Sequence, residues 1–229
     1  MDFEALWLTL RLAVGTTAIL LVAALPLAWW IASGRGGAVR ALVQAVVALP
    51  LVLPPTVLGF YLLIAMGPLT APGRLLMRVF GHPLAFSFSG LLVGSVLYSL
   101  PFAVQPLVAG FSAVDRGYVE AAAGLGARPA KVFLSVVLPM ARASVLTSAV
   151  LTFTHTVGEF GVVLMLGGNI PGSTRTLSIS LYDLVQDGNY AAADRTALVL
   201  VGFAVVALLA IYLLPSMRKV DGRQADIVR

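Results

Sequence analysis

The chain has 229 residues, of which 59% are apolar and only 11% are charged. A soluble domain carries about 25% charged residues, so this chain has too few charges to cover the surface of a soluble protein of its size. The mean hydropathy of +0.98 and the low charge content exclude an ordinary soluble enzyme and a disordered chain. They indicate a protein that is embedded in lipid.

The sequence contains no cysteine, which excludes disulfides, thiolate metal sites and cysteine nucleophiles. The formal net charge is +5, which in a soluble domain would suggest binding to nucleic acid. Here the basic residues fall in short gaps between apolar stretches, so we interpret them as a signal of membrane topology. We expect the lipid bilayer as a partner and no nucleic acid.

Five long stretches are almost free of charged residues. A bilayer core about 30 Å thick needs roughly 20 apolar residues per helix, and backbone groups in lipid must be bonded within the helix. The period-2 polarity of a membrane barrel is missing. We predict an all-α polytopic membrane protein with five transmembrane helices in a single domain, residues 1–229. The predicted spans are about 9–33, 41–66, 86–112, 140–167 and 196–217.

The first span does not resemble a cleaved signal peptide, because Asp2 and Glu4 precede it and its apolar run is too long. Within the second span, the prolines at 50, 54 and 55 prevent residues 49–55 from forming one straight helix. Two interpretations stay open: a kink that neighbouring helices tolerate, or irregular backbone that lines a water-filled space.

The gaps between the spans carry Lys and Arg unevenly. With five spans, ten basic residues, including Arg35, Arg40 and Arg229, collect on one side of the membrane and five on the other. Cytoplasmic loops carry the excess of Lys and Arg. We therefore predict that the N-terminus lies outside, that the C-terminus is cytoplasmic, and that the third gap is cytoplasmic.

This third gap, residues 113–139, is much longer than a connection requires. Residues 118–123 are strong helix formers, Gly124 and Gly126 permit a sharp turn, and Pro129 favours the start of a second helix. We predict two short helices that lie along the inner face of the membrane. On physical grounds alone, an ordinary loop is the alternative.

The fourth span contains His155 and Glu159, which are four residues apart and share a helix face. Two ligands make a weak metal site, so we interpret them as a polar pair packed against other helices or a cavity. A charged Glu159 near the centre of the bilayer would cost about 3 kcal/mol. It should therefore lie near the outer interface or face the protein interior, where Gly158 and Gly161 permit a hinge.

The third gap also carries a recognisable motif. Glu120-Ala121-Ala122, then Gly126, Val136 and Leu138-Pro139, is similar to the EAA motif of ABC importer permeases, with valine in place of the usual isoleucine. The resemblance implies the type I ABC importer permease fold. It also implies that Glu120, Ala121, Ala122 and Gly126 dock into a groove on a separate, dimeric ATP-binding subunit.

Other segments resemble the molybdate permeases within that group. The Gly-Glu-Phe-Gly element is shared with sulfate permeases, whereas the Asn-Ile-Pro-Gly and Thr-Arg-Thr elements favour molybdate. Some members have a further N-terminal helix. We expect this chain to lack it, because the first span follows closely after the first residue. The matching segments are 49–55 with Gly59, 158–161, 168–172 and 174–176.

The resemblance implies a molybdate importer, with tungstate as an equal possibility, in the cell inner membrane. An extracytoplasmic molybdate-binding protein would dock on the outer loops, where Asn169, Thr174 and Arg175 are candidates. Alternatives are a sulfate or thiosulfate permease and a stand-alone anion channel or secondary carrier.

The sequence contains no Walker A loop, since 167–172 lacks the lysine. We therefore expect no enzyme activity, cofactor or metal in this chain, with ATP and Mg²⁺ bound by the partner subunit. A dianion cannot cross hydrocarbon, and no Lys or Arg lies in a span away from its ends, so the path must be aqueous and weakly binding. A homodimer with the path on its two-fold axis would enclose it. Candidates for the pathway or gate are Ser99, Thr152, Thr154, Thr156 and Glu159, although the hydroxyls could equally bond to their own helix backbone.

Overall fold

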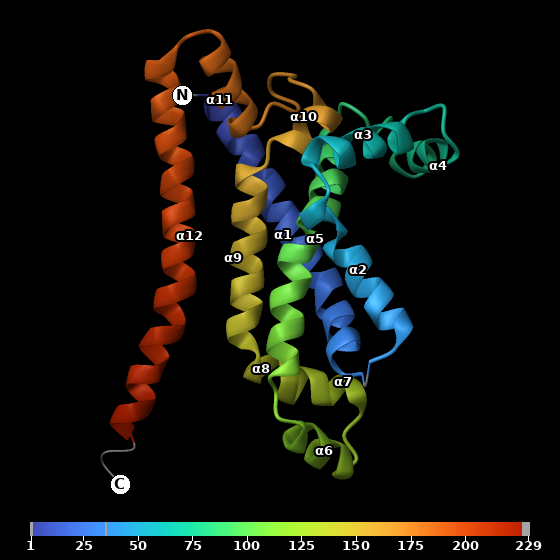
Figure 1. The fold of residues 1–229 in the computed structure, drawn as a ribbon, viewed down its shortest axis with the longest axis vertical. Coiled ribbons are helices and arrows are strands. Elements are labelled where there is room, and N and C mark those ends of the chain that lie inside the picture. The colour runs from blue at the N-terminus through green and yellow to red at the C-terminus, as the bar shows by residue number, and fades with distance from the viewer. Residues whose placement is uncertain (1, 35, 226–229) are drawn as a thin grey trace.

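The computed structural model describes residues 2–34 and 36–225, with side chains up to residue 213, and these residues form helices and no strand (Figure 1). Arg35 and Arg229, which contribute to the predicted topology, lie outside the described residues. In chain order the helices are α1 (Phe3–Ala32), α2 (Ala38–Val52), α3 (Pro55–Met66), α4 (Ala71–Phe80), α5 (Phe88–Ser112), α6 (Arg116–Gly124), α7 (Pro129–Val132), the π-helix η1 (Phe133–Val137), α8 (Leu138–Met140), α9 (Arg142–Gly158), α10 (Gly161–Gly167), α11 (Leu177–Gln186) and α12 (Tyr190–Ala225).

Helices α1, α5 and α9 pack along one another and form the centre of the molecule (Figure 1). Two of them begin at side-chain caps: Asp2 accepts a hydrogen bond from Ala5 N at 2.9 Å, and Ser87 accepts one from Gly90 N at 3.1 Å. The core residues are aliphatic and small, including the fully buried Leu20 and Leu107. The predicted span 86–112 agrees closely with α5.

The predicted span 41–66 is two helices, α2 and α3, which meet at an angle of 112°. Leu53 has an extended backbone, and Pro55 is the first residue of α3. This confirms that residues 49–55 do not form one straight helix. Proline removes a helical hydrogen-bond donor, and the residue before it avoids the helical conformation, which explains the break.

The predicted span 140–167 is also interrupted, because α9 ends at Gly158 and α10 is a separate short helix. Glycine lets α10 approach its neighbours closely. A Cβ on Gly161 would lie 2.6 Å from Pro55 Cβ, and one on Gly59 would lie 2.7 Å from Met165 Cβ. The chain therefore folds α10 against α3 and α5 instead of extending α9 through the whole predicted span.

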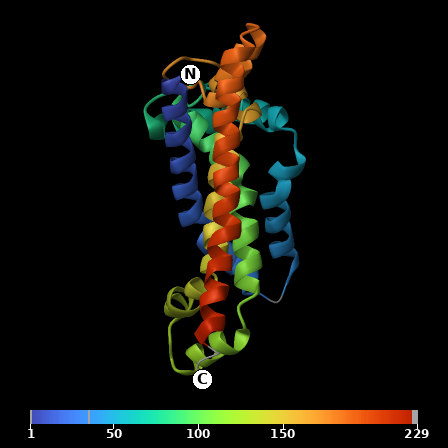
Figure 2. The ribbon, with the colours of Figure 1, turned by 90° about the vertical axis from the view of Figure 1, so that its left-hand side faces the viewer.

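Three helical segments of the described chain are long and apolar enough to cross a membrane: Phe3–Ala32, Phe88–Ser112 and Tyr190–Leu213. The number rises to as many as five if each of two bent helix pairs counts as one span. One pair is α2 with α3, and the other joins Pro129–Met140 to α9. Helix α12 runs alongside the bundle and contacts α9 and α11 (Figure 2).

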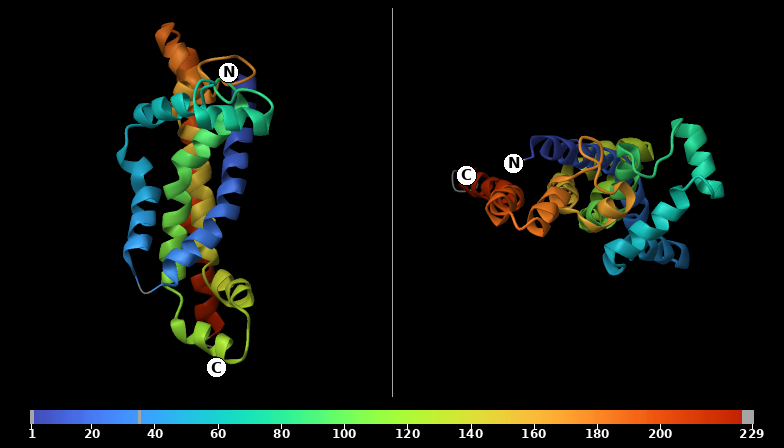
Figure 3. Two further views of the ribbon diagram at one scale, coloured as in Figure 1. Left: turned by 90° about the vertical axis from the view of Figure 1, so that its right-hand side faces the viewer. Right: turned by 90° about the horizontal axis from the view of Figure 1, so that it is seen from above.

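The connections gather at the two ends of the bundle. The N-terminus, α3, α4, α10 and α11 lie at one end (Figures 1 and 3). The turn between α1 and α2, the α6–α7 segment and the C-terminal part of α12 lie at the other. The chain thus places the predicted cytoplasmic segments together, away from the predicted outer loops.

Candidate functional site

Helix α6 and the turn that follows it form an elbow, residues 115–132, that projects beyond the bundle (Figure 1). Asp115 starts α6 by accepting a hydrogen bond from Gly117 N at 2.8 Å. Glu120 and Ala121 are exposed and Ala122 is half-buried, and no residue of α6 is fully buried. The predicted EAA residues thus lie on a helix with a small-residue surface that another protein can approach closely.

The elbow turns at Gly126, whose φ is +81°. The Ala127 N–H donates to Ala122 O at 3.1 Å, and the Gly126 N–H donates to Ala123 O at 2.9 Å. These two bonds form a Schellman motif, which requires a left-handed residue at this position and therefore favours glycine. The predicted turn is confirmed, and Pro129 begins α7 as expected.

The base of the elbow is attached to the bundle by an aromatic cluster that sequence reasoning missed. The Phe133 ring lies 5.8 Å from the Trp29 ring and 5.6 Å from the Phe111 ring, measured between centroids. Trp29 and Phe111 are themselves 6.1 Å apart. The cluster joins the π-helix to the ends of α1 and α5, so the base of the elbow packs directly against both central helices.

A cavity of about 570 Å³ lies between the elbow, the turn after α1 and the end of α5. Glu120 and Arg116 line it from α6, and Arg40 and Gln44 line it from α2. Among the described residues, α6 packs against α7 and η1, and its Val119 reaches the hydrophobic core of the bundle beside this cavity.

Four of the five candidate pathway residues lie in packed helix interfaces. Ser99, Thr152 and Thr156 are at most 2% exposed, and Glu159 is 5% exposed. Ser99 Oγ is 3.1 Å from Thr156 Oγ1, and Thr156 Oγ1 donates to Thr152 O at 2.9 Å. In this conformation these side chains face the protein interior, and their assignment to the path or gate stays a prediction.

Thr154 is half-buried, and its hydroxyl donates to Val150 O at 2.8 Å. The alternative that these hydroxyls bond to their own helix backbone is therefore confirmed for Thr154 and Thr156. Such bonds satisfy the hydroxyl without a partner from another helix.

His155 and Glu159 do not meet. His155 Nδ1 is 2.9 Å from Ser99 Oγ, and its ring stacks on Phe102 with 3.9 Å between centroids. Ser95 Oγ donates to Glu159 Oε2 at 3.3 Å. Glu159 faces the protein interior, one of the two predicted locations, at the break between α9 and α10.

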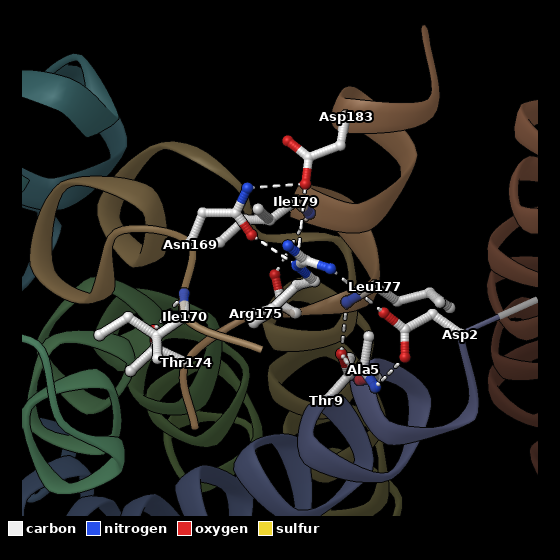
Figure 4. Close-up of polar contacts among 11 residues, drawn as sticks. Asp2, Ala5, Thr9, Asn169, Ile170, Thr174, Arg175, Leu177, Ile179 and Asp183 are labelled. Atoms are coloured by element: carbon white, nitrogen blue, oxygen red, sulfur yellow. Dashed lines mark hydrogen bonds and ion pairs between the residues drawn. The ribbon is translucent and has the colours of Figure 1, made fainter. Parts of the chain in front are cut away.

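Arg175 is the centre of a polar cluster at the end of the molecule that holds the N-terminus (Figure 4). Its Nε donates to Asn169 Oδ1 at 2.6 Å and lies 3.7 Å from Asp183 Oδ2. Its Nη1 lies 3.9 Å from Asp2 Oδ2. The cluster borders a hollow of about 360 Å³, and Asn169 and Arg175 both reach the surface.

Thr174, the third predicted docking residue, is fully buried. Its Oγ1 donates to Gly167 O at 2.6 Å. It also accepts from Ile170 N at 3.2 Å (Figure 4), so it closes the loop instead of presenting a contact surface. Thr9 has a similar role that sequence reasoning missed: its Oγ1 accepts from Leu177 N at 2.8 Å and donates to Ala5 O at 2.7 Å.

The fold and the elbow together define a class of protein: a multi-pass membrane component whose bundle carries a two-helix elbow at one end and closed polar loops at the other. The model of the family described as "Binding-protein-dependent transport system inner membrane component" matches residues 24–223. The chain belongs to this family.

Two molybdenum transport permeases match most of the chain. The Molybdenum transport system permease protein ModB of Azotobacter vinelandii is 50% identical over 211 residues, which are 92% of this chain and 93% of that protein. The protein of the same name from Escherichia coli (strain K12) is 36% identical over 171 residues, covering 74% and 75%.

Solved structures show the same fold at low identity. A chain of the inward-facing MetNI methionine ABC transporter matches with a TM-score of 0.72 at 19% identity and covers 92% of this chain and 93% of that chain. A chain of a bacterial ABC transporter for alginate matches with a TM-score of 0.72 at 20% identity, covering 95% and 78%. The described helices thus adopt a fold found in the membrane subunits of ABC importers.

Proposed function

We propose that this chain is the permease subunit of an ABC importer that moves molybdate into the cytoplasm, driven by ATP hydrolysis in a separate subunit. The observation that carries the proposal is the 50% identity to a molybdenum transport permease over nearly the whole chain. Tungstate has nearly the same size and charge, so we expect it to be carried as well.

The proposed orientation places the N-terminus outside and the C-terminus in the cytoplasm. Its support is the grouping of the elbow with the C-terminal part of α12 at one end of the bundle. The elbow region contributes Arg116, Arg128, Lys131 and Arg142 to that end, and cytoplasmic segments carry such an excess.

In this arrangement the elbow docks on the ATP-binding subunit, which holds ATP and Mg²⁺. The exposed Glu120 and Ala121 form the contact surface, Ala122 allows close approach, and Gly126 fixes the angle to α7. When two ATPases close, the elbows are drawn together, and the aromatic cluster carries the movement to α1 and α5. A rigid-body change of this kind switches the access of the central path.

The path itself lies between two copies of this chain. A single copy offers no open passage beside its candidate hydroxyls, which are packed inside the bundle, so the second copy supplies the other wall. The hydroxyl contact between Ser99 and Thr156 then joins α5 to α9, Thr152 is buried and Thr154 half-buried, and Glu159 lies at the break between α9 and α10.

At the outer end, an extracytoplasmic binding protein would deliver the oxyanion to the surface around Asn169 and Arg175. Both side chains are partly accessible and are held by Asp2 and Asp183. Selectivity then resides in the binding protein, because the only Lys or Arg residues inside the predicted spans are Arg11 and Arg142, near the ends of their spans, and neither is placed to hold the ion at mid-membrane.

Uptake by the complete transporter in proteoliposomes tests the proposal, with unlabelled molybdate, tungstate and sulfate competing against labelled molybdate. We expect molybdate and tungstate to compete equally, sulfate to compete poorly, and uptake to require ATP. Preferential competition by sulfate would favour the sulfate permease. Oxyanion flux through liposomes that contain this chain alone would favour the channel or carrier and contradict the proposal.

A further inference from the structure

Helix α4 is left with an exposed face that the transport function does not use. It lies to the side of the bundle, near the end that holds the N-terminus, and projects outward together with α3 (Figures 1 and 3). Leu75 is 62% exposed and Val79 is 71% exposed, and Leu69, just before the helix, is 91% exposed. Large apolar side chains that cluster in this way mark an interaction surface.

The structure fixes which side of α4 faces outward. Gly73 is buried so closely against the Gly67 carbonyl that any side chain there would overlap it, and Leu76 packs against the second hydrophobic core. Thr70 caps the helix by accepting from Gly73 N at 3.1 Å, and Gly81 ends it with a φ of +75°. The exposed face is therefore a fixed feature of the fold.

Charged and apolar residues are separated on this exposed side. Leu75 and Val79 are four residues apart and share one strip, whereas Arg74 and Arg78 share the adjacent strip. Arg74 also donates from Nη1 to Leu69 O at 2.8 Å, which holds the loop and the helix together. An apolar strip beside a basic strip is typical of a helix that lies in the membrane interface.

The height of α4 along the bundle is set by its neighbours. It is joined to α5, one of the membrane-crossing helices, by residues 81–87 only, and Ser87 caps α5. On its other side α3 exposes Phe60 and Tyr61, and aromatic side chains of this kind are enriched at the membrane surface. Helix α4 thus lies where a bilayer around the bundle has its boundary.

We propose that α4 is an in-plane anchor that binds phospholipid at the end of the bundle that holds the N-terminus. Leu69, Leu75 and Val79 enter the acyl region, and Arg74 and Arg78 bind lipid phosphates. The anchor holds the α3–α4 segment at a fixed depth while the bundle changes conformation. This inference depends on the membrane-spanning fold and is independent of the transported ion.

Single-cysteine spin labelling tests the proposal directly, because the natural chain contains no cysteine. Leu75→Cys and Val79→Cys are labelled in the full chain in nanodiscs of phosphatidylcholine and phosphatidylglycerol. Leu209→Cys, on the exposed apolar side of α12, is the lipid reference, and Gln186→Cys, at the end of α11, is the water reference. All four positions are exposed, so the fold should tolerate each label.

We expect the ratio of oxygen to nickel-complex accessibility at 75 and 79 to match that at 209 and to exceed that at 186 several-fold. A ratio equal to that at 186 would overturn the proposal and place α4 in water. Low accessibility to both reagents, combined with spin–spin broadening between two chains, would also overturn it and assign the face to a second copy of this chain.

Discussion

At the scale of single residues, Gly126 is the position where the elbow is most sensitive. A Cβ there would meet no atom within 4 Å, so a substitution is opposed only by the left-handed backbone, at about 1–2 kcal/mol. We expect Gly126→Ala to change the angle between α6 and α7 and to reduce uptake per ATP hydrolysed in the reconstituted transporter, while the amount of protein in the membrane stays unchanged.

Gly124→Ala is the matched control for this prediction. Gly124 is the last residue of α6, it also has open space around its Cα, and its φ is not positive. Alanine favours the helix, so this variant should transport as the natural protein does. If both variants take up the same amount of substrate per ATP hydrolysed, the Schellman turn does not set the docking geometry.

A substitution at Thr9 should lower the stability of the folded chain. Thr9 is 1% exposed and is the acceptor for Leu177 N, so Thr9→Val leaves a buried N–H without a partner, at a cost of about 1–3 kcal/mol. We expect a lower melting temperature in detergent, with α11 and the preceding loop released first. Proteolysis near residue 175 at a temperature below the main transition reports that release.

Thr16→Val provides the comparison, since Thr16 lies on the same helix and is equally buried but its Oγ1 has no hydrogen-bond partner among the described residues. Replacing that hydroxyl with a methyl group should leave the melting temperature unchanged or raise it. If both variants melt alike, the bond between Thr9 and Leu177 contributes nothing measurable.

The three candidate docking residues in the outer loops illustrate what a sequence reveals about single side chains. Asn169 and Arg175 were expected at the surface, and both are there. Thr174 was expected beside them and is buried, because its hydroxyl closes the loop between Gly167 and Ile170. A small polar residue in a loop has no pattern that distinguishes a surface contact from an internal bond, so only the folded backbone separates the two.

At the scale of elements, we expect the aromatic contacts between η1 and the bundle to determine whether the elbow moves α1 and α5. Phe133→Ala removes the ring that contacts both Trp29 and Phe111 and should cost about 2–4 kcal/mol, somewhat less than a fully buried ring. We expect a lower melting temperature and ATP hydrolysis that continues with little uptake.

Leu134→Ala is the neighbouring control, because Leu134 is 60% exposed and its loss should leave the melting temperature of the isolated chain nearly unchanged. Normal coupling in Phe133→Ala would contradict the proposed transmission through the aromatic cluster. A fall in melting temperature without a fall in uptake per ATP would restrict the cluster to a structural role.

Hydropathy predicted the elements well where a helix is straight and crosses the molecule. The span 86–112 corresponds to α5, and the elbow follows from its helix formers, glycines and Pro129. The span 140–167 was too long because an apolar window does not detect the turn at Glu159, where the chain folds back against α3. Helix α4 was missed for a related reason: its two arginines and short length give no membrane signal, and its role depends on where α3 and α5 place it.

At the scale of the whole molecule, the charge distribution and the path of the chain agree on one arrangement. The predicted cytoplasmic segments are far apart in sequence, yet the turn after α1, the elbow and the C-terminal part of α12 lie at one end (Figure 3). Composition could predict this separation because each crossing reverses the side. It could not predict the packing of α12 beside α9, since an all-apolar helix has no polar face to orient it.

Cysteine labelling of intact cells tests this topology. Gln186→Cys, at the end with the N-terminus, and Ala113→Cys, between α5 and the elbow, are both exposed. If the basic segments are cytoplasmic and the chain crosses the membrane an odd number of times between 113 and 186, the two positions lie on opposite sides. A membrane-impermeant maleimide should then label position 186 on intact cells and position 113 only after permeabilisation. The reverse pattern would invert the orientation and place the elbow where no ATPase can reach it. Labelling of both positions on intact cells would instead require an even number of crossings between them, because one of the bent pairs would then turn back within the membrane.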